Sequence, residues 1–426
     1  MTDTYDYIQA RNTNIFLVGY LLYSFGFVMT RTNPSYLLYI ANELLCFLGV
    51  AMVTFSLLVS IRMRDTVSGY VKMIVALLII WFYVLVAWSM PFEFDFIKAK
   101  LFIGESSLMT YFVPLVVFIP NKLQFIKKAM TGVVILGVVY FLFMVVFKDV
   151  IFKFYGNSVE NNRYVFEFCA KWLSLCGGFL ILTFTYQSKK VKVFAVFLIL
   201  AMLLVAIFRA RRAIMFMAVV PALMAAVIYI AQSRYKLLAI ITSILLGMGI
   251  FFYAVQAYES DQAGLFGNLA TRIDQDSRSG VEECFKNDFT FTDWIVGRGF
   301  EGRYFCPNID ENNEVAGYRT MIETDYLMII LKNGSVYLVL LLLVLIPAVF
   351  KGIFNSKNIL SKAAACWILF WLVCLYPANV FGFSMNYLLV WLSVGVCYSK
   401  TIRNIPDTIL KDYFLNDNEE LDLMNQ

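Results

Sequence analysis

Long apolar segments recur along almost the whole chain, and they limit what it can fold into more than any other feature. Runs close to the roughly 20 residues that cross the hydrocarbon core of a bilayer appear from near 14–30 to near 383–399. In lipid, backbone polar groups are satisfied only in helices or closed barrels, and these runs are too long and continuous for barrel strands. Only 15% of residues are charged, against roughly 25% in an average globular domain. The chain is predicted to be an all-α polytopic membrane protein.

The runs predict about twelve transmembrane helices and one large loop. The spans lie near 14–30, 36–60, 70–90, 101–119, 129–147, 166–186, 193–208, 213–231, 237–258, 325–349, 363–380 and 383–399. Helices 1–9 therefore occupy 1–258, the loop 259–324, helices 10–12 325–400 and a tail 401–426, whose acidic part is predicted to be a surface segment. The N-terminus is polar and lacks the basic region of a cleavable signal, so the first span is expected to remain.

The distribution of basic residues predicts which way the spans face. With both termini inside, the inward connections carry eighteen Lys and Arg residues and the short outward turns carry nine. This bias predicts cytoplasmic termini and an external large loop. Ten of fifteen arginines face outward, whereas thirteen of twenty lysines face inward. Lysine suffices as a point charge against lipid headgroups, so the outward arginines indicate recognition of a ligand.

The loop from Glu259 to Asp325 contains six basic and fourteen acidic residues, a net charge of −8. So acidic a segment does not attract anions at long range, and its arginines are better interpreted as individually placed donor forks for carboxylate or phosphate. Pairing with neighbouring acids is the alternative for each. The candidates are Arg272 and Arg278 in TRIDQDSRSG, Arg298 and Arg303 in VGRGFEGRYF, and Arg319. The glycines beside the second pair permit close approach to a ligand, or form a plain loop corner.

Two further sets of charges lie at the predicted outer membrane boundary. Arg209, Arg211 and Arg212 in FRARRAIMF form a candidate clamp for a lipid-linked diphosphate, with snorkelling toward lipid as the alternative. Glu323 and Asp325 in IETDYL stand where an external cavity should end, and a partly desolvated carboxylate there could serve as a general base. Helix capping by Thr324 or Asp325 is the alternative. Charges predicted inside spans must face the bundle interior or water: Glu43, Glu105, Glu167, Lys171 and Lys332.

Cysteine and histidine usage limits the chemistry. Six of the eight cysteines lie in apolar spans. Cys284 and Cys306 lie in the large loop and, if it faces an oxidising compartment, could form a disulfide around Arg298; two unpaired thiols are the alternative. The chain has no histidine, which excludes histidine bases and ligands, and no cysteine cluster has zinc spacing. No metal and no cofactor are expected.

These same stretches resemble the bacterial O-antigen polymerase family of the Wzy type, which is related to the O-antigen ligases within the metal-independent GT-C membrane glycosyltransferases. ARRAI resembles the family's Ser-Arg-x-Ala turn with Arg211 at the arginine, although Ala210 replaces the usual serine. RIDQDSR and IVGRGF resemble the arginine segment and the glycine-rich piece of the loop, and ETDYLMIILKNGSVY resembles the opening of the next helix. Where ligases and many relatives have His-Asn, this chain has Glu323-Thr324, which favours polymerase over ligase.

The resemblance implies an enzyme of lipopolysaccharide or surface polysaccharide biosynthesis that joins repeat units linked to undecaprenyl diphosphate. It implies inverting glycosyl transfer at the periplasmic face of the bacterial inner membrane, with Glu323 or Asp325 as base. Arg211, Arg272 and Arg278 are the first choices for the diphosphate, followed by Arg209, Arg212, Arg298, Arg303 and Arg319. Membrane lipid and a chain-length regulator are the other implied partners, and nucleic acid is not one.

Two other functions remain open from the sequence. A ligase would transfer finished glycan to a lipid A core or another acceptor. A non-enzymatic exporter would move the lipid-linked glycan without changing it.

Overall fold

The computed structural model describes residues 2–32, 35–61, 67–102, 107–148, 168–209, 211–232, 278–307 and 317–416. Within these ranges, seven helices are long and apolar enough to cross a membrane. They are α1 (Thr2–Thr30), α2 (Tyr36–Ser60), α3 (Gly69–Ser89), α5 (Lys122–Val146), α9 (Lys189–Phe208), α10 (Arg212–Gln232) and α15 (Asp325–Phe354). The prediction of an all-α membrane protein is confirmed at this level.

Shorter apolar helices complete the bundle. They are η2 (Leu108–Phe118), η3 (Ala170–Ser174), α8 (Gly177–Leu182), η4 (Phe184–Tyr186), α16 (Ile359–Cys374) and α17 (Met385–Tyr398). Every residue of α17 is buried, and this helix packs against η2, α5, α15 and α16, so it forms the centre of the bundle.

Two predicted spans are not single α-helices. The span near 101–119 consists of the end of α4 (Phe94–Phe102) and the 3₁₀ helix η2, which contains Pro114, with 103–106 outside the described residues. The span near 166–186 is broken by a π-helical turn, in which the N–H of Leu175 donates to the carbonyl of Ala170. The span near 237–258 lies outside the described residues, so the total of twelve stays a prediction.

The described part of the large loop is a small folded unit rather than an open connection. It contains α13 (Ser279–Asp288), α14 (Phe291–Val296) and the two-residue strands β1 (Tyr304–Phe305) and β2 (Tyr318–Arg319), which pair antiparallel. A disulfide joins Cys284 of α13 to Cys306 after β1. The apolar core of this unit includes Phe285 and Tyr304 and continues onto α15. The loop is thereby fixed to the membrane helix that follows it.

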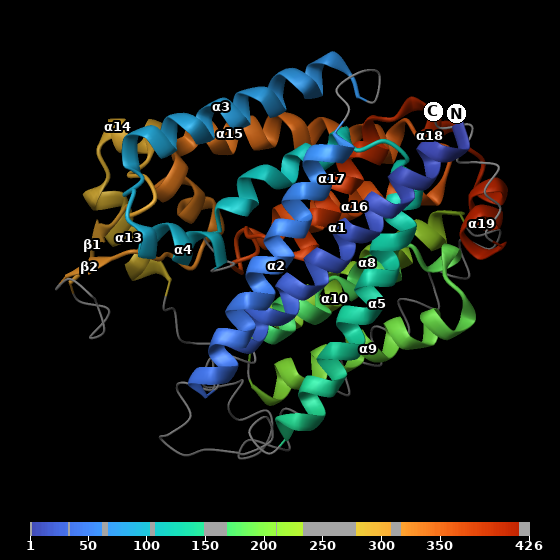
Figure 1. The fold of residues 1–426 in the computed structure, drawn as a ribbon, viewed down its shortest axis with the longest axis horizontal. Helices are drawn as coiled ribbons and strands as arrows, with labels where there is room; N and C mark the ends of the chain where they lie inside the picture. Colours follow the sequence, from blue (N-terminus) through green and yellow to red (C-terminus); the bar gives the residue numbers. More distant parts are fainter. Residues whose placement is uncertain are drawn as a thin grey trace.

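The two ends of the bundle carry different elements (Figure 1). The start of α1 lies near α18 (Lys400–Asn404) and α19 (Asp407–Asn416), whereas α13, α14, β1 and β2 lie at the far end. The sequence predicts a surface segment from Asp407 onward, and within it α19 lies on the surface with one face against the bundle. Leu410 and Tyr413 are buried, and the carboxylate of Asp407 accepts a hydrogen bond from Tyr186. The amphipathic helix therefore docks on the bundle.

Candidate functional site

Arg278 and Glu323 form an ion pair where the loop meets the membrane helices. Nε of Arg278 donates to Oε2 of Glu323 at 3.2 Å. The other guanidinium nitrogens donate to the carbonyls of Tyr376 at 3.3 Å and Pro377 at 2.7 Å. Three of the five guanidinium donors are thus used to join α13, the segment before α15 and the connection between α16 and α17. The contact brings together two of the side chains selected from the sequence.

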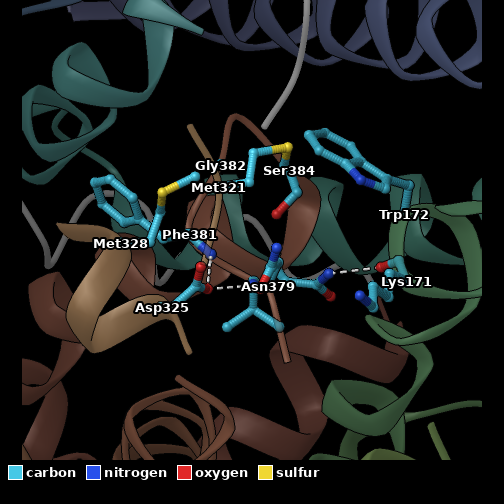
Figure 2. Close-up of a pocket in the computed structure, with 11 residues that line it drawn as sticks. Lys171, Trp172, Met321, Asp325, Met328, Asn379, Phe381, Gly382 and Ser384 are labelled. Atoms are coloured by element: carbon cyan, nitrogen blue, oxygen red, sulfur yellow. Dashed lines mark hydrogen bonds between the residues drawn. The ribbon is translucent and has the colours of Figure 1, made fainter. Parts of the chain in front are cut away.

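The two candidate carboxylates have different environments. The side chain of Glu323 is 53% exposed, so it can meet a substrate, although it lacks the desolvation that the sequence predicts. Asp325 is only 2% exposed, and its Oδ2 accepts from the backbone N–H groups of Val380 and Phe381. These bonds shape the turn that follows α16 (Figure 2). Glu323 is therefore the better placed of the two to receive a proton from a substrate, and Asp325 is placed to hold the turn.

Thr324 stands at the N-cap position of α15 but makes no side-chain capping bond. Its hydroxyl instead donates to Oε1 of Glu282 in α13 at 2.8 Å. The side chain of Thr324 therefore does not cap α15, which was the alternative considered from the sequence. It forms a second link between the loop and the start of α15.

A small pocket of mixed polar and apolar lining lies beside Asp325, between the π-helical turn η3, the start of α15 and the connection between α16 and α17 (Figure 2). Its enclosed volume is about 20 Å³, and a water molecule needs roughly 10–15 Å³ on the same measure. The pocket as it stands holds one small polar group rather than a whole sugar. Its lining residues are Lys171, Trp172, Met321, Asp325, Met328, Asn379, Val380, Phe381, Gly382, Ser384 and Asn386.

Sequence reasoning found only part of this pocket. Lys171 is recognisable as a charge inside an apolar span, and it is 9% exposed in the structure. Asn379 and Asn386 were missed. The available signal was an amide side chain within an apolar span, because an intramembrane polar group is expensive and needs a partner or a function. π-helical turns are also frequent at functional sites, but a hydropathy pattern does not reveal them.

The arginine cluster lies at the turn between α9 and α10. Arg209 ends α9, and burial lowers the pKa of its guanidinium. The N–H of Arg211 donates to the carbonyl of Ala206 at 2.8 Å, and Arg212 begins α10 with an exposed side chain. A shared site for these arginines with Arg278 stays a prediction. Arg272 lies outside the described residues.

Arg298 is held by partners inside the loop. Its Nη1 donates to the carboxylate of Asp288 and to the carbonyl of Arg303, and its Nη2 donates to the Asp293 carboxylate at 2.8 Å. The guanidinium also lies 4.6 Å from the ring centre of Phe289. These contacts match the alternative of pairing with neighbouring acids, and a substrate contact at Arg298 stays a prediction.

Electrostatics agree with this internal role. Burial alone would raise the pKa of Asp293, but hydrogen bonds from Arg298 and Thr290 outweigh it and hold that pKa below its ordinary value. Burial alone would likewise lower the pKa of Arg298, but its bonds to Asp293 and Asp288 outweigh it and raise that pKa. The pair is a charged clamp of the loop. Arg303 and Arg319 remain predicted substrate contacts, and Arg319 lies in β2 opposite Tyr304.

The remaining predicted intramembrane charges are partly accounted for. Glu43 forms an ion pair with Lys98, with 2.8 Å between Oε2 and Nζ. Nζ of Lys332 donates to the carbonyl of Gly302 at 2.9 Å. Glu105 and Glu167 lie outside the described residues. In the described part of the chain, no group of three or more His, Cys, Asp or Glu residues could hold a metal ion.

Comparison with known proteins identifies no relative of this chain. No protein-family model matches the chain, no curated protein matches it, and no solved structure matches it. The fold and the site define a class: an all-α membrane protein with a disulfide-linked loop unit and a small pocket beside an arginine–glutamate pair.

Proposed function

We propose that the protein is a surface polysaccharide polymerase of the O-antigen type, which joins repeat units carried on undecaprenyl diphosphate. The observation that carries the proposal is the Arg278–Glu323 pair, a cation suited to phosphate beside an exposed carboxylate suited to proton transfer. It stands at the edge of the pocket, because Met321 and Asp325, on either side of Glu323, both line that pocket. An enzyme that moves sugar from a lipid diphosphate needs these groups together.

The proposed reaction is a single inverting displacement. A hydroxyl oxygen of the acceptor repeat unit attacks the anomeric carbon of the growing glycan, and its proton passes to the Glu323 carboxylate. The bond between the anomeric carbon and the phosphate oxygen breaks, and undecaprenyl diphosphate departs with the electron pair. Arg278 stabilises the charge that develops on that oxygen, with Arg211 and Arg272 as further predicted donors. The phosphate ester bond already supplies the activation, so no nucleotide sugar takes part.

The Cys284–Cys306 disulfide supports the proposed location. Disulfides persist in oxidising compartments such as the bacterial periplasm and are rare in the cytoplasm. On this ground we propose that the loop and the reaction lie in the periplasm. The charge bias of the sequence supports cytoplasmic termini and a location in the inner membrane. Lipid-linked oligosaccharide is the substrate partner, and a chain-length regulator is the proposed protein partner.

The test is polymerisation by the purified protein in detergent, with single lipid-linked repeat units as the only substrate. We expect products that are longer than one unit, which an exporter cannot make. Cells that lack the protein distinguish the ligase alternative, because loss of a polymerase leaves single units on lipid A and loss of a ligase leaves none. If single units never lengthen with wild-type protein, the proposal fails.

The predicted diphosphate contact at Arg211 has its own test. Arg211→Lys should lower activity nearly as much as Arg211→Ala, because lysine keeps the charge but loses the planar fork. Near-normal activity of the lysine variant would argue against a bidentate phosphate contact. Arg403→Lys is the matched control, since Arg403 donates to the Asn355 carbonyl at the other end of the bundle.

A further inference from the structure

Asn386 leaves one buried hydrogen-bond acceptor unused at the pocket. Its Nδ2 donates to the carbonyl of Lys171 at 2.8 Å, and its backbone carbonyl accepts from Nε1 of Trp367 at 3.1 Å. The residue is 3% exposed, and its Oδ1 has no hydrogen-bond partner among the described residues. Buried polar atoms are nearly always paired, so this oxygen calls for a partner that none of the described residues supplies.

The orientation of this amide follows from its neighbours. The Lys171 carbonyl can only accept, so the amide nitrogen of Asn386 must face it, and a flipped amide would set oxygen against oxygen. Oδ1 is therefore the atom left for a ligand, and it requires a donor. A hydroxyl group is a donor, whereas phosphate diesters and carboxylates at neutral pH have no proton to give.

The rest of the lining favours a neutral ligand of the same kind. One cationic side chain, Lys171, and one anionic side chain, Asp325, line the pocket, so its formal charge is zero and it has no net attraction for an anion. Trp172, held against Phe27 with ring centres 4.6 Å apart, supplies an apolar wall beside these polar groups. Ligand pockets commonly combine apolar and aromatic walls with a few polar groups that fix orientation.

The pocket also adjoins the proposed reaction site. Arg278 donates to the carbonyl of Pro377, two residues before the lining residue Asn379, and Glu323 lies between the lining residues Met321 and Asp325. A ring with one substituent in the pocket would therefore lie next to the Arg278–Glu323 pair. The enclosed volume of about 20 Å³ limits that substituent to roughly the size of one or two water molecules.

We propose that this pocket is the specificity subsite for the acceptor saccharide, that it binds one neutral hydroxyl or hydroxymethyl substituent, and that Oδ1 of Asn386 accepts its hydrogen bond. The inference rests on the proposed transferase function only in assigning the bound saccharide the role of acceptor. Its physical content, a saccharide hydroxyl bound at Asn386, does not depend on turnover.

The kinetic test compares three variants of the full-length protein in detergent. Asn386→Leu keeps the branched shape but removes the Oδ1 acceptor, together with the Nδ2 bond to the Lys171 carbonyl, and Met321→Trp fills the pocket mouth from a side chain that is 45% exposed. Both should raise KM for the single lipid-linked repeat unit without raising KM for the growing chain. For Asn386→Leu we expect about tenfold, the effect of one lost hydrogen bond, and for Met321→Trp at least as much, because the ring excludes the substituent. Ser393→Ala is the matched control. It removes a buried polar atom that likewise has no partner among the described residues, from the same helix but outside the pocket, and it should leave both KM values unchanged.

A binding test separates this inference from the proposed function. Methyl glycosides of neutral hexoses should change the tryptophan fluorescence of wild-type protein. The change should be lost in Asn386→Leu and in Trp172→Phe, with thermal unfolding used to verify that the variants are folded. This result supports the subsite even if the protein never polymerises repeat units, in which case only the proposed function fails. Unchanged acceptor KM in both pocket variants, or a pocket occupied by ordered water only with no response to glycosides, overturns the inference.

Discussion

Gly297 of the loop and Gly334 of α15 meet backbone to backbone. Both have positive φ, +81° and +72°, and a Cβ added at Gly297 would lie 2.5 Å from the nitrogen of Gly334. α15 kinks at Gly334, which has a non-helical backbone, and the carbonyls freed there find other donors. The Leu331 carbonyl accepts from the N–H of Arg298 at 2.7 Å. Trp81 donates to the Asn333 carbonyl at 2.8 Å. The loop is thus built into the membrane helix.

Replacing Gly334 with alanine should destabilise the protein. A side chain there is strained at positive φ and would overlap the carbonyl oxygen of Ile295, so we expect a loss of about 1–3 kcal/mol. Thermal unfolding in detergent measures it. Gly69→Ala is the control, because Gly69 begins α3 with nothing within 4 Å of the added Cβ. Equal melting temperatures for the two variants would show that the close approach of Gly334 to the backbone of Ile295 and Val296 contributes nothing.

This contact shows what sequence reasoning could and could not supply about the loop. Glycines beside Arg298 suggest either a ligand or a corner, and the sequence contains no signal that links Gly297 to a residue 37 positions later. The choice depends on which backbone approaches the glycine, and that follows only from the packing of α14 on α15. The same holds for Arg298, whose partners Asp288 and Asp293 are two of fourteen acids in the segment.

The helices themselves were largely predictable, because an apolar run of about 20 residues must satisfy its backbone internally in lipid. The breaks were not. The mean hydropathy of 166–186 indicates an apolar span, but it does not reveal the π-helical hydrogen bond from residue i to residue i−5. That bond forms the turn from which Lys171 and Trp172 line the pocket. Glu323 was identified because it is a charge at the edge of an apolar run, whereas Asn386 looks like one more tolerated polar residue until its partners are seen.

Asp325→Asn and Glu323→Gln should have different effects, because the two carboxylates have different roles. An asparagine oxygen is a weaker acceptor than a carboxylate for the N–H groups of Val380 and Phe381, so the turn should loosen and melting temperature should fall. Glu323→Gln should instead abolish polymerisation at unchanged melting temperature, because its side chain is largely exposed. Glu283→Gln, on the surface of α13, is the control. Full turnover by the Glu323 variant would refute its role as base.

Arg278→Lys should lower the polymerisation rate at least about tenfold. One ammonium cannot reproduce three separate bonds to Glu323, Tyr376 and Pro377, and the loss of a single charged hydrogen bond is already worth roughly a factor of ten. The rate should be measured at saturating substrate. A lysine variant with the wild-type rate would show that charge alone is required there.

The clamp between Arg298 and Asp293 predicts an acid sensitivity of the loop. The folded-state pKa of Asp293 lies below its ordinary value, so its stabilisation is complete above about pH 4 and is lost as pH falls through the lower, folded-state pKa. The difference in melting temperature between wild-type protein and Asp293→Asn should therefore be constant near neutrality and should shrink at acid pH. Glu283→Gln should show no such trend, and a difference that grows at acid pH would reverse the sign of the predicted linkage.

Reduction of the Cys284–Cys306 disulfide should destabilise the loop unit more than the membrane helices. The bond links positions 22 residues apart, and closing a loop of this size constrains the unfolded chain by about 3 kcal/mol. Mass spectrometry of unreduced peptides should recover the linked pair, and free thiols there would remove the bridge. Hydrogen exchange should then show faster exchange in α13 and β1 of the Cys284→Ser variant, with little change in α17, where every residue is buried. Exchange that becomes faster to the same extent across the whole protein would contradict a local effect of the disulfide, which lies entirely within the loop unit.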